Sequence, residues 1–286
     1  MLTEMRIVLR GRWLTTNVVQ QIAQQAGAGL IEQRSAVLWR LEQFAAPVKA
    51  AQRERIRAAA YAVRADLNFI EHPRKLGSYR LAVMDMDSTL ITIECIDEIA
   101  GMLGLKPQVA AITEAAMRGD IAYPDSLRQR VSLLKGLDVA ALERVYNERL
   151  QLSPGAGMML AAFKAAGLKT LLVSGGFTFF TGKLQARLGL DYTRSNVLGI
   201  ADGKLTGAVV GPIIDAGAKA VQLAETCAQL GCPASDAIAM GDGANDLKMM
   251  AVAGLSVAYR AKPVVRAQAM TALNHNGLDA VLDFFD

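Results

Sequence analysis

The 286-residue sequence predicts an α/β fold with a doubly wound, mostly parallel sheet, together with a small N-terminal α+β domain. After Pro154, short apolar stretches alternate with amphipathic helical stretches, and this alternation is typical of a parallel sheet. Between about 93 and 152 the pattern is helical throughout, which indicates a helical bundle inserted into that fold. The length suits one large domain and a smaller one.

Residues 1–75 are expected to form the small domain, because His72-Pro73-Arg74-Lys75 reads as a polar joint before the larger one. The order strand, helix, strand-like stretch, helix, strand resembles a regulatory module of the ACT kind. Such a module is compatible with a homodimer and with an amino-acid effector. The expected elements are a strand at 6–11, a helix capped by Thr15 or Thr16 and ended by Gly27 and Gly29, a strand-like stretch of unsettled register at 30–44, a helix at 48–66 and a strand at 69–72.

The N-terminal part of the chain is basic, with 13 Lys and Arg against 6 Asp and Glu in residues 1–80. A basic face can contact nucleic acid, but no aromatic stacking pattern accompanies these arginines, so no nucleic-acid partner is expected. The simpler interpretation is a helix with one solvated face. That face would hold Arg53, Arg55, Arg57 and Arg64, and the opposite face Ile56, Ala60 and Val63.

The composition narrows the classes of protein to which this chain can belong. With 52% hydrophobic and 20% charged residues the chain is of ordinary globular composition. Every long apolar stretch is interrupted before the roughly 18 residues that a membrane span needs, and residues 1–13 lack the apolar core of a signal peptide. Three cysteines without a C-x-x-C motif favour a reducing, cytoplasmic compartment. Because there are only two histidines, carboxylates are expected to carry the chemistry.

Residues 76–286 are expected to form the large domain, with the helical insert over its sheet. A strand at 81–84 opens it, and further strands are expected at 169–173 and 237–240, with a last one at 255–258. Asp202-Gly203 is the strongest hairpin signal in the chain. The expected helices of this domain lie at 155–166, 179–188 and 217–230, and Pro124 is expected to start a helix of the insert.

Three predicted strands end in acidic or small residues. These strand ends carry Asp85 and Asp87, then Ser174-Gly175-Gly176, then Asp242 and Asp246. Because ligands bind beyond the carboxyl ends of such strands, we expect the three segments to form one site. Gathered carboxylates repel one another, so a divalent cation with oxygen ligands is implied, most simply Mg²⁺.

Phosphoryl transfer fits these groups. An aspartate is ionised at pH 7 and attacks phosphorus without a histidine to deprotonate it. Its attack on a phosphate dianion from about 3.5 Å meets a repulsion of order 10 kcal/mol at an effective dielectric constant of about 20. A bound cation and the side chain of Lys219 are suited to cancel that repulsion.

Four segments together resemble the haloacid dehalogenase-like phosphatases. Asp85-Met86-Asp87-Ser88-Thr89 is similar to the D-x-D-x-T signature of that family, although Met86 stands where many relatives have Phe. Ser174, Lys219 and the segment 241–246 are similar to its later motifs, in the same order. The insert and its flanks, including TLITIECIDEIA and SLRQRVSLLKGL, resemble the phosphoserine phosphatases within that family, and the resemblance covers about residues 80–275.

The resemblance implies a role for each matching position in the core. Asp85 would be the nucleophile that forms an aspartyl-phosphate, and Asp87 the acid and base, with a pKa raised by acidic neighbours. Mg²⁺ would be held by Asp85, the backbone carbonyl of Asp87 and Asp242, with Asp246 in support. The phosphoryl group would be held by Ser174, Gly175 and Lys219, with Asn245 nearby.

The same resemblance implies how the insert reads the substrate. Glu94 would take the ammonium of O-phosphoserine and Arg130 its carboxylate, while Met117 and Tyr123 close the pocket. The implied activity is magnesium-dependent hydrolysis of O-phosphoserine to serine and phosphate, in serine biosynthesis. Two alternatives stay open: a phosphatase or phosphotransferase of the same family that acts on another small phosphate monoester, and an amino-acid sensor with vestigial catalysis. A nicotinamide-dependent dehydrogenase is disfavoured because no G-x-G-x-x-G motif follows a strand.

Overall fold

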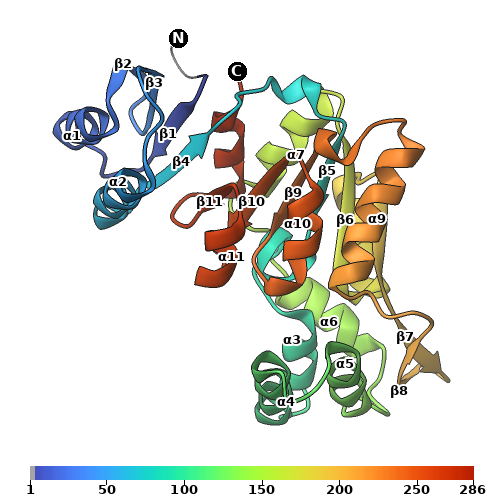
Figure 1. Cartoon of the computed structure of the whole chain (residues 1–286). Helices are drawn as coiled ribbons and strands as arrows, with labels where there is room; N and C mark the ends of the chain where they lie inside the picture. Colours follow the sequence, from blue (N-terminus) through green and yellow to red (C-terminus); the bar gives the residue numbers. More distant parts are fainter. Residues whose placement is uncertain (1–3) are drawn as a thin grey trace.

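The computed structural model describes residues 4–286, which form two β-sheets with their helices (Figure 1). The N-terminal sheet has the strand order β2-β3-β1-β4, and its paired strands are antiparallel. Its helices pack on one face around Ile7, Leu9 and Leu41. The elements of this part are β1 (Arg6–Arg10), α1 (Thr16–Ala26), β2 (Ala28–Ser35), β3 (Leu38–Phe44), α2 (Ala50–Ala62) and β4 (Asp66–Ile70).

The predicted order of elements in this sheet is confirmed, and several predicted bounds are wrong. Thr15 caps α1 and Gly27 ends it with a left-handed φ of 71°, but Gly29 lies inside β2. The stretch of unsettled register is a hairpin of two strands, β2 and β3. Helix α2 ends at Ala62 rather than 66, and the following strand begins at Asp66 rather than 69.

The expected solvated face is found in part. Arg55, Arg57 and Arg64 are exposed and Arg53 is half-buried. Ile56 and Ala60 on the opposite face are buried. The guanidinium groups of Arg53 and Arg57 lie 4.6 and 5.0 Å from the centre of the Phe69 ring, and Arg53 also pairs with Glu71. Arg64 lies beyond the helix end. These arginines stack on an aromatic side chain because their long apolar stems favour such surfaces over full hydration.

The second sheet has seven strands in the order β11-β10-β9-β5-β6-β7-β8. Every pair is parallel except β7 with β8. The strands are β5 (Leu81–Met84), β6 (Lys169–Phe177), β7 (Tyr192–Ala201), β8 (Lys204–Val210), β9 (Ala237–Gly241), β10 (Leu255–Tyr259) and β11 (Thr271–Leu273). The helices between them are α7 (Ala156–Ala165), α8 (Thr178–Leu188), α9 (Ala216–Gln229), α10 (Leu247–Val252) and α11 (Pro263–Gln268).

Strand β5 shows why this sheet is covered on both faces. Ala82 and Met84 join the apolar cluster that includes α7 and α8, whereas Leu81 and Val83 join the cluster that includes α9 and α10. Side chains alternate across a strand, so an entirely apolar strand must be buried on both sides. The predicted doubly wound α/β fold is confirmed.

The helical insert also forms as predicted, and one strand was missed. The four short helices of the insert, which we call the cap, are α3 (Cys95–Gly101), α4 (Lys106–Arg118), α5 (Tyr123–Ser132) and α6 (Ala140–Glu148), and they lie together at one end of the large sheet (Figure 1). Asp202 and Gly203 form the hairpin turn with φ of 50° and 72°, as a two-residue turn of this type needs. The strand at 255–258 is not the last, because three-residue β11 follows it.

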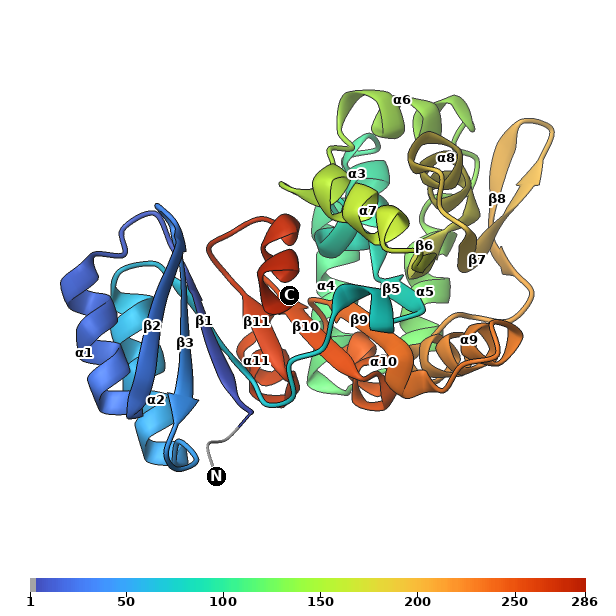
Figure 2. The ribbon, with the colours of Figure 1, turned by 90° about the horizontal axis from the view of Figure 1, so that it is seen from above.

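Residues 271–286 join the two sheets, and Figure 2 shows this segment between them. The carboxylate of Asp66, at the start of β4, accepts hydrogen bonds from the backbone N–H groups of Asn274, His275 and Asn276. Arg10 pairs with Asp279 and Asp283 at 2.6 and 2.8 Å. The N-terminal sheet is therefore fixed to the large one by charged and polar contacts. Within residues 4–286, no helix is long and apolar enough to cross a membrane.

Candidate active site

The predicted site lies at the carboxyl ends of the central strands. Asp85 follows β5 directly, and one of its oxygens accepts a hydrogen bond from the Met86 backbone N–H at 2.7 Å. The turn after it, residues 86–90, contains Ser88 with a φ of 55°, a left-handed conformation that costs a serine free energy. This turn reverses the chain so that Asp87 and Thr89 face the same region as Asp85.

A buried lysine joins two of the carboxylates. The Lys219 ammonium, from the first turn of α9, lies 2.8 Å from Asp85 Oδ1 and 2.7 Å from Asp246 Oδ1. Both Lys219 and Asp246 have no exposed surface, and Asp85 is 5% exposed. Burial alone would lower the pKa of Lys219, but Asp246 and Asp85 outweigh it and raise that pKa. Lys219 is therefore a permanent cation at this site.

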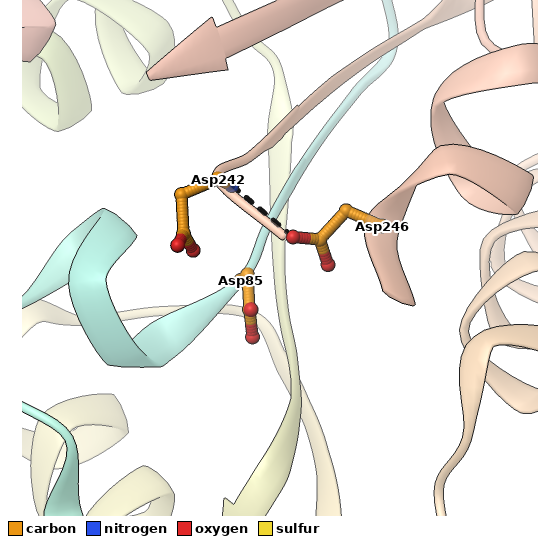
Figure 3. Close-up of side chains that lie close together, drawn as sticks. All are labelled: Asp85, Asp242 and Asp246. Atoms are coloured by element: carbon orange, nitrogen blue, oxygen red, sulfur yellow. Dashed lines mark hydrogen bonds between the residues drawn. The ribbon is translucent and has the colours of Figure 1, made fainter. Parts of the chain in front are cut away.

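Asp242 completes a cluster of three carboxylates (Figure 3). One oxygen from each of Asp85, Asp242 and Asp246 lies within 4.8 Å of the others. This separation is comparable with the roughly 4 Å between opposite ligands of one Mg²⁺ ion. Asp246 also accepts hydrogen bonds from the Asp242 and Gly243 N–H groups at 3.1 Å, so both of its oxygens already have partners. Asp85 and Asp242 are thus better placed to hold a cation than Asp246.

The cluster holds more negative than positive charge, and its pKa values show the imbalance. Burial and the neighbouring Asp246 raise the pKa of Asp85 well above its ordinary value, although Lys219 opposes them. Burial, Asp246 and Glu94 raise the pKa of Asp242 to about 6. One lysine does not neutralise three carboxylates, and a divalent cation would supply the missing charge.

Asp87 has the properties of an acid that is protonated near neutral pH. Burial, followed by the charge of Glu94, raises the pKa of Asp87 to about 7. The predicted direction is found, although burial contributes more than the acidic neighbours. The Cys95 backbone N–H donates a hydrogen bond to Asp87 Oδ1 at 3.0 Å and fixes the carboxyl group.

The Ser174-Gly175-Gly176 segment lies within β6 rather than after it. Its pairing with β7 is interrupted between Val173 and Phe177, which leaves the intervening backbone free of strand partners on that side. The hydroxyl of Ser174 accepts a hydrogen bond from the Gly176 N–H at 2.8 Å. A Cβ atom on Gly175 would collide with the Tyr123 hydroxyl, and one on Gly176 with Asp87 and Met86. A larger residue at either position would therefore displace the Tyr123, Met86 or Asp87 side chain that borders the site.

The predicted substrate residues of the cap lie around the mouth of the site, with looser contacts. The Tyr123 hydroxyl is 3.5 Å from the Gly175 carbonyl, and Glu94 accepts a hydrogen bond from Ser88 Oγ at 2.6 Å. Half-buried Arg130 bonds only to the Ser126 carbonyl and has no carboxylate partner within residues 4–286. Its neighbour Arg128 pairs with Asp125 at 3.0 Å.

Met117 and Asn245 are the predicted site residues whose side chains are least fixed by contacts. The side chain of Met117 is 64% exposed and lies on the cap, where its sulfur is 3.7 Å from the Lys262 ammonium. Asn245 is half-buried in the loop after β9, and its side chain has no hydrogen bond within the described residues. Both lie on elements that border the cluster.

Sequence reasoning assigned no role to several residues that support the site, although Thr89 stands in the matched motif. Thr89 donates a hydrogen bond to Asp242 at 3.1 Å, and Asn196 bonds both the Gly175 carbonyl and the Ile214 N–H. Lys262 lies in the loop after β10, where its N–H donates to the Asp242 carbonyl at 3.3 Å. Asn196 and Lys262 carry no local motif, and only the folded chain brings them to the site. The three cysteines are free, as expected.

The comparison with protein families agrees with this geometry. Residues 79–254 match the model of the haloacid dehalogenase-like hydrolases, and the chain belongs to that family. This match confirms the expectation that the protein is an enzyme, a hydrolase. Relatives that are named phosphoserine phosphatase confirm the expected class, a phosphoric monoester hydrolase.

The relatives point to one branch of the family. The chain is 61% identical over 214 residues to a Polaromonas sp. phosphoserine phosphatase. The matched region covers 73% of this chain and 91% of the relative. It is similar along 99% of both chains to the crystal structure of a haloacid dehalogenase family hydrolase of Salmonella enterica serovar Typhi, with a TM-score of 0.90 and 33% identity. A substrate-bound phosphoserine phosphatase complex is 38% identical, with a TM-score of 0.68, over 73% of this chain and 99% of that one.

Proposed function

We propose that this protein is a magnesium-dependent phosphatase that hydrolyses O-phosphoserine to serine and phosphate through an aspartyl-phosphate intermediate. The observation that carries the proposal is the buried group of Asp85, Lys219, Asp246 and Asp242 at one edge of the sheet. The relatives named phosphoserine phosphatase support the choice of substrate.

The residues around Asp85 are suited to hold a metal ion. Their donors are carboxylate oxygens, the ligands that Mg²⁺ prefers, and Asp85 and Asp242 would hold it, with the Asp87 carbonyl as a further ligand. Asp246 would support them, since its oxygens bond Lys219 and two backbone N–H groups. When bound, the ion supplies positive charge that lowers the repulsion between a carboxylate and a phosphate dianion.

Asp85 is the nucleophile in this mechanism. One Asp85 oxygen attacks phosphorus, the bond from phosphorus to the serine oxygen breaks, and an acyl phosphate forms on Asp85. Lys219, the Ser174 hydroxyl and the backbone at Gly175 would hold the phosphoryl oxygens, with Asn245 beside them. These groups are fixed by burial and hydrogen bonds before substrate arrives, which is the condition for electrostatic stabilisation.

Asp87 carries the proton. A pKa of about 7 lets a fraction of the enzyme hold Asp87 in its protonated form, so that it can protonate the leaving serine oxygen. The resulting Asp87 carboxylate then takes a proton from water as that water attacks the acyl phosphate. The cycle ends with phosphate released and Asp87 protonated again.

The cap would select the amino acid. Arg130 is a guanidinium without a carboxylate partner, and Glu94 offers a carboxylate at the same mouth. One fixed cation and one fixed anion match the carboxylate and ammonium of a zwitterion. Met117 and Tyr123 would close over the bound substrate.

The test is release of inorganic phosphate from O-phosphoserine, with and without Mg²⁺, beside a panel of other small phosphate monoesters. We expect kcat/KM for phosphoserine to exceed that for the other esters, and activity to require the ion. Faster turnover of another ester would favour a phosphatase or phosphotransferase of different specificity. Serine binding without any turnover would favour a sensor.

The wider role remains part of the proposal. A serine-forming reaction would belong to cytoplasmic serine biosynthesis, and residues 1–75 would form an ACT-like regulatory domain before the catalytic domain, residues 76–286. An amino-acid effector and a homodimer are compatible with such a domain. Serine-independent kinetics of the full chain would argue against an effector.

A further inference from the structure

A second polar cavity lies between the N-terminal domain and the large sheet, away from the carboxylate cluster. Its volume is about 430 Å³. Its walls come from the end of α2, the loop after β10, helix α11 and the segment after β11. The lining residues are Tyr61, Arg64, Arg260, Ala261, Arg266, Asn274 and His275.

The lining is strongly basic. Three arginines line the cavity, two of them exposed, and no Asp or Glu lines it. Arg64, Arg260 and Arg266 form no ion pair with any described residue. Arg266 donates a hydrogen bond to Asn274 at 3.3 Å, and the guanidinium of Arg260 lies 5.3 Å from the centre of the Tyr259 ring. The carboxylate of Asp66, which binds the same segment after β11, is 3% exposed and its oxygens are taken by the backbone of residues 274–276.

Two of these arginines have strained backbones. Arg64 has a φ of 52° and Arg260 a φ of 45°, the left-handed region in which glycine or asparagine is the usual residue. An arginine at such a position costs stability that a glycine would not. The strain would be tolerated if the two side chains are needed where they lie.

One buried polar atom of the lining residues has no partner among the described residues. The Nε2 atom of His275 is buried and has no hydrogen-bond partner within residues 4–286, while its ring lies 4.8 Å from the ring of Tyr61. A buried polar atom without a partner is unfavourable and is expected to meet a ligand or a water molecule. Asn274 adds a side-chain amide to the same wall.

We propose that this cavity binds a small phosphate-bearing molecule. Three guanidinium forks, an amide and an imidazole suit the several acceptor oxygens and the double negative charge of a phosphate group. The proposal does not depend on the reaction at Asp85, because none of the lining residues belongs to that site.

Binding is measured by calorimetric titration of the full chain with inorganic phosphate and, separately, with pyrophosphate, both in EDTA. The variants are Arg64→Gly and Arg266→Ala, and the matched control is Arg55→Ala, which removes one charge from the exposed surface of α2 outside the cavity. We expect each cavity variant to weaken binding about tenfold, as loss of a charged hydrogen bond does, and Arg55→Ala to leave the affinity unchanged.

Arg64→Gly also separates binding from folding. Because glycine relieves the positive φ, the melting temperature of this variant without ligand should equal or exceed that of the parent while phosphate binding falls. The proposal is overturned if neither anion binds the parent protein, or if the cavity variants bind as the control does. Serine binding that depends on Arg64 and Arg266, without phosphate binding, would also overturn it.

Discussion

The buried carboxylate cluster and the cap hold their side chains around one site in contrasting ways. Lys219 and Asp246 have no exposed surface and are held by paired charges, whereas Met117 is 64% exposed and Arg130 bonds only a backbone carbonyl. Groups fixed before binding stabilise a transition state, while loosely held groups adapt to a ligand and let it leave. In the proposed mechanism, the chemistry therefore belongs to the buried cluster and the selection of substrate to the more exposed cap.

Replacing Asp85 should have the largest effect. Asp85→Asn removes the attacking carboxylate and should lower kcat by about 10⁴-fold or more, as loss of a nucleophile does in other enzymes. Phosphate release from phosphoserine measures it. Circular dichroism checks that the variant is folded. Activity within tenfold of the parent would disprove the role of Asp85 and, with it, the division between cluster and cap.

Removing the metal ion should have the second largest effect on activity. EDTA should abolish turnover and excess Mg²⁺ should restore it, because a bare cluster of three carboxylates repels a phosphate dianion. Persistent activity in EDTA, with the metal content checked by elemental analysis, would contradict the proposed cofactor.

The stability of the metal-free protein should depend on Asp242. Its pKa is raised to about 6 in the folded chain, so the folded state holds a proton that the unfolded state has lost. Stability should thus fall as pH rises from about 4 to 6. Asp242→Asn should reduce that fall in thermal melts recorded in EDTA, and it should also remove the stabilisation by Mg²⁺. If the pH dependence of stability is the same in Asp242→Asn as in the parent, a group other than Asp242 is responsible for it.

Arg130 and Arg128 test the cap. Arg130→Ala should raise KM for phosphoserine about 10- to 100-fold, the cost of one charged hydrogen-bonded contact, with a smaller change for a phosphate ester that has no carboxylate. Arg128→Ala is the matched control, since that arginine is exposed and already paired with Asp125. Equal effects of Arg130→Ala on both substrates would exclude it as the carboxylate reader.

Met117 should show the smallest effect. Met117→Ala removes an exposed cap side chain and should raise KM only a few-fold, about 1 kcal/mol or less of lost apolar contact. Met158→Ala is the control, because Met158 is 65% exposed on α7 in the large domain. A loss of kcat as large as that of Asp85→Asn would break the distinction between the two regions.

Much of the fold could be predicted from the sequence because local patterns coincide with the final environment. The apolar run at 81–84, the Asp202-Gly203 turn and the Thr15 cap each follow from residue chemistry alone. β11 could not be predicted, since three residues carry no periodic signal and pair only because β10 lies beside them. The full length of β6 was also not predicted. Its last residues lie beyond the point where its pairing with β7 is interrupted, and the sequence carries no signal for such an extension.

The site divides in a similar way. Asp85, Ser174, Lys219 and Asp242 could be proposed because strand ends converge and because the motifs resemble a family. Arg130 could not be separated from Arg128 by spacing, and the structure separates them by the ion pair that only Arg128 makes. Asn196 bonds the Gly175 carbonyl, and the Cys95 N–H bonds Asp87. Neither Asn196 nor Cys95 belongs to one of the four motif segments, so the sequence alone could not assign them these contacts.

The contacts of Arg10 with Asp279 and Asp283 have a consequence for how the molecule assembles. They join positions 269 and 273 residues apart along the chain, so forming them closes a loop of almost the whole chain. Closing so long a loop is entropically slow, and the two sheets should acquire their own cores first. Refolding should therefore end in a late docking phase, which Arg10→Ala would slow or weaken without disturbing the earlier ones.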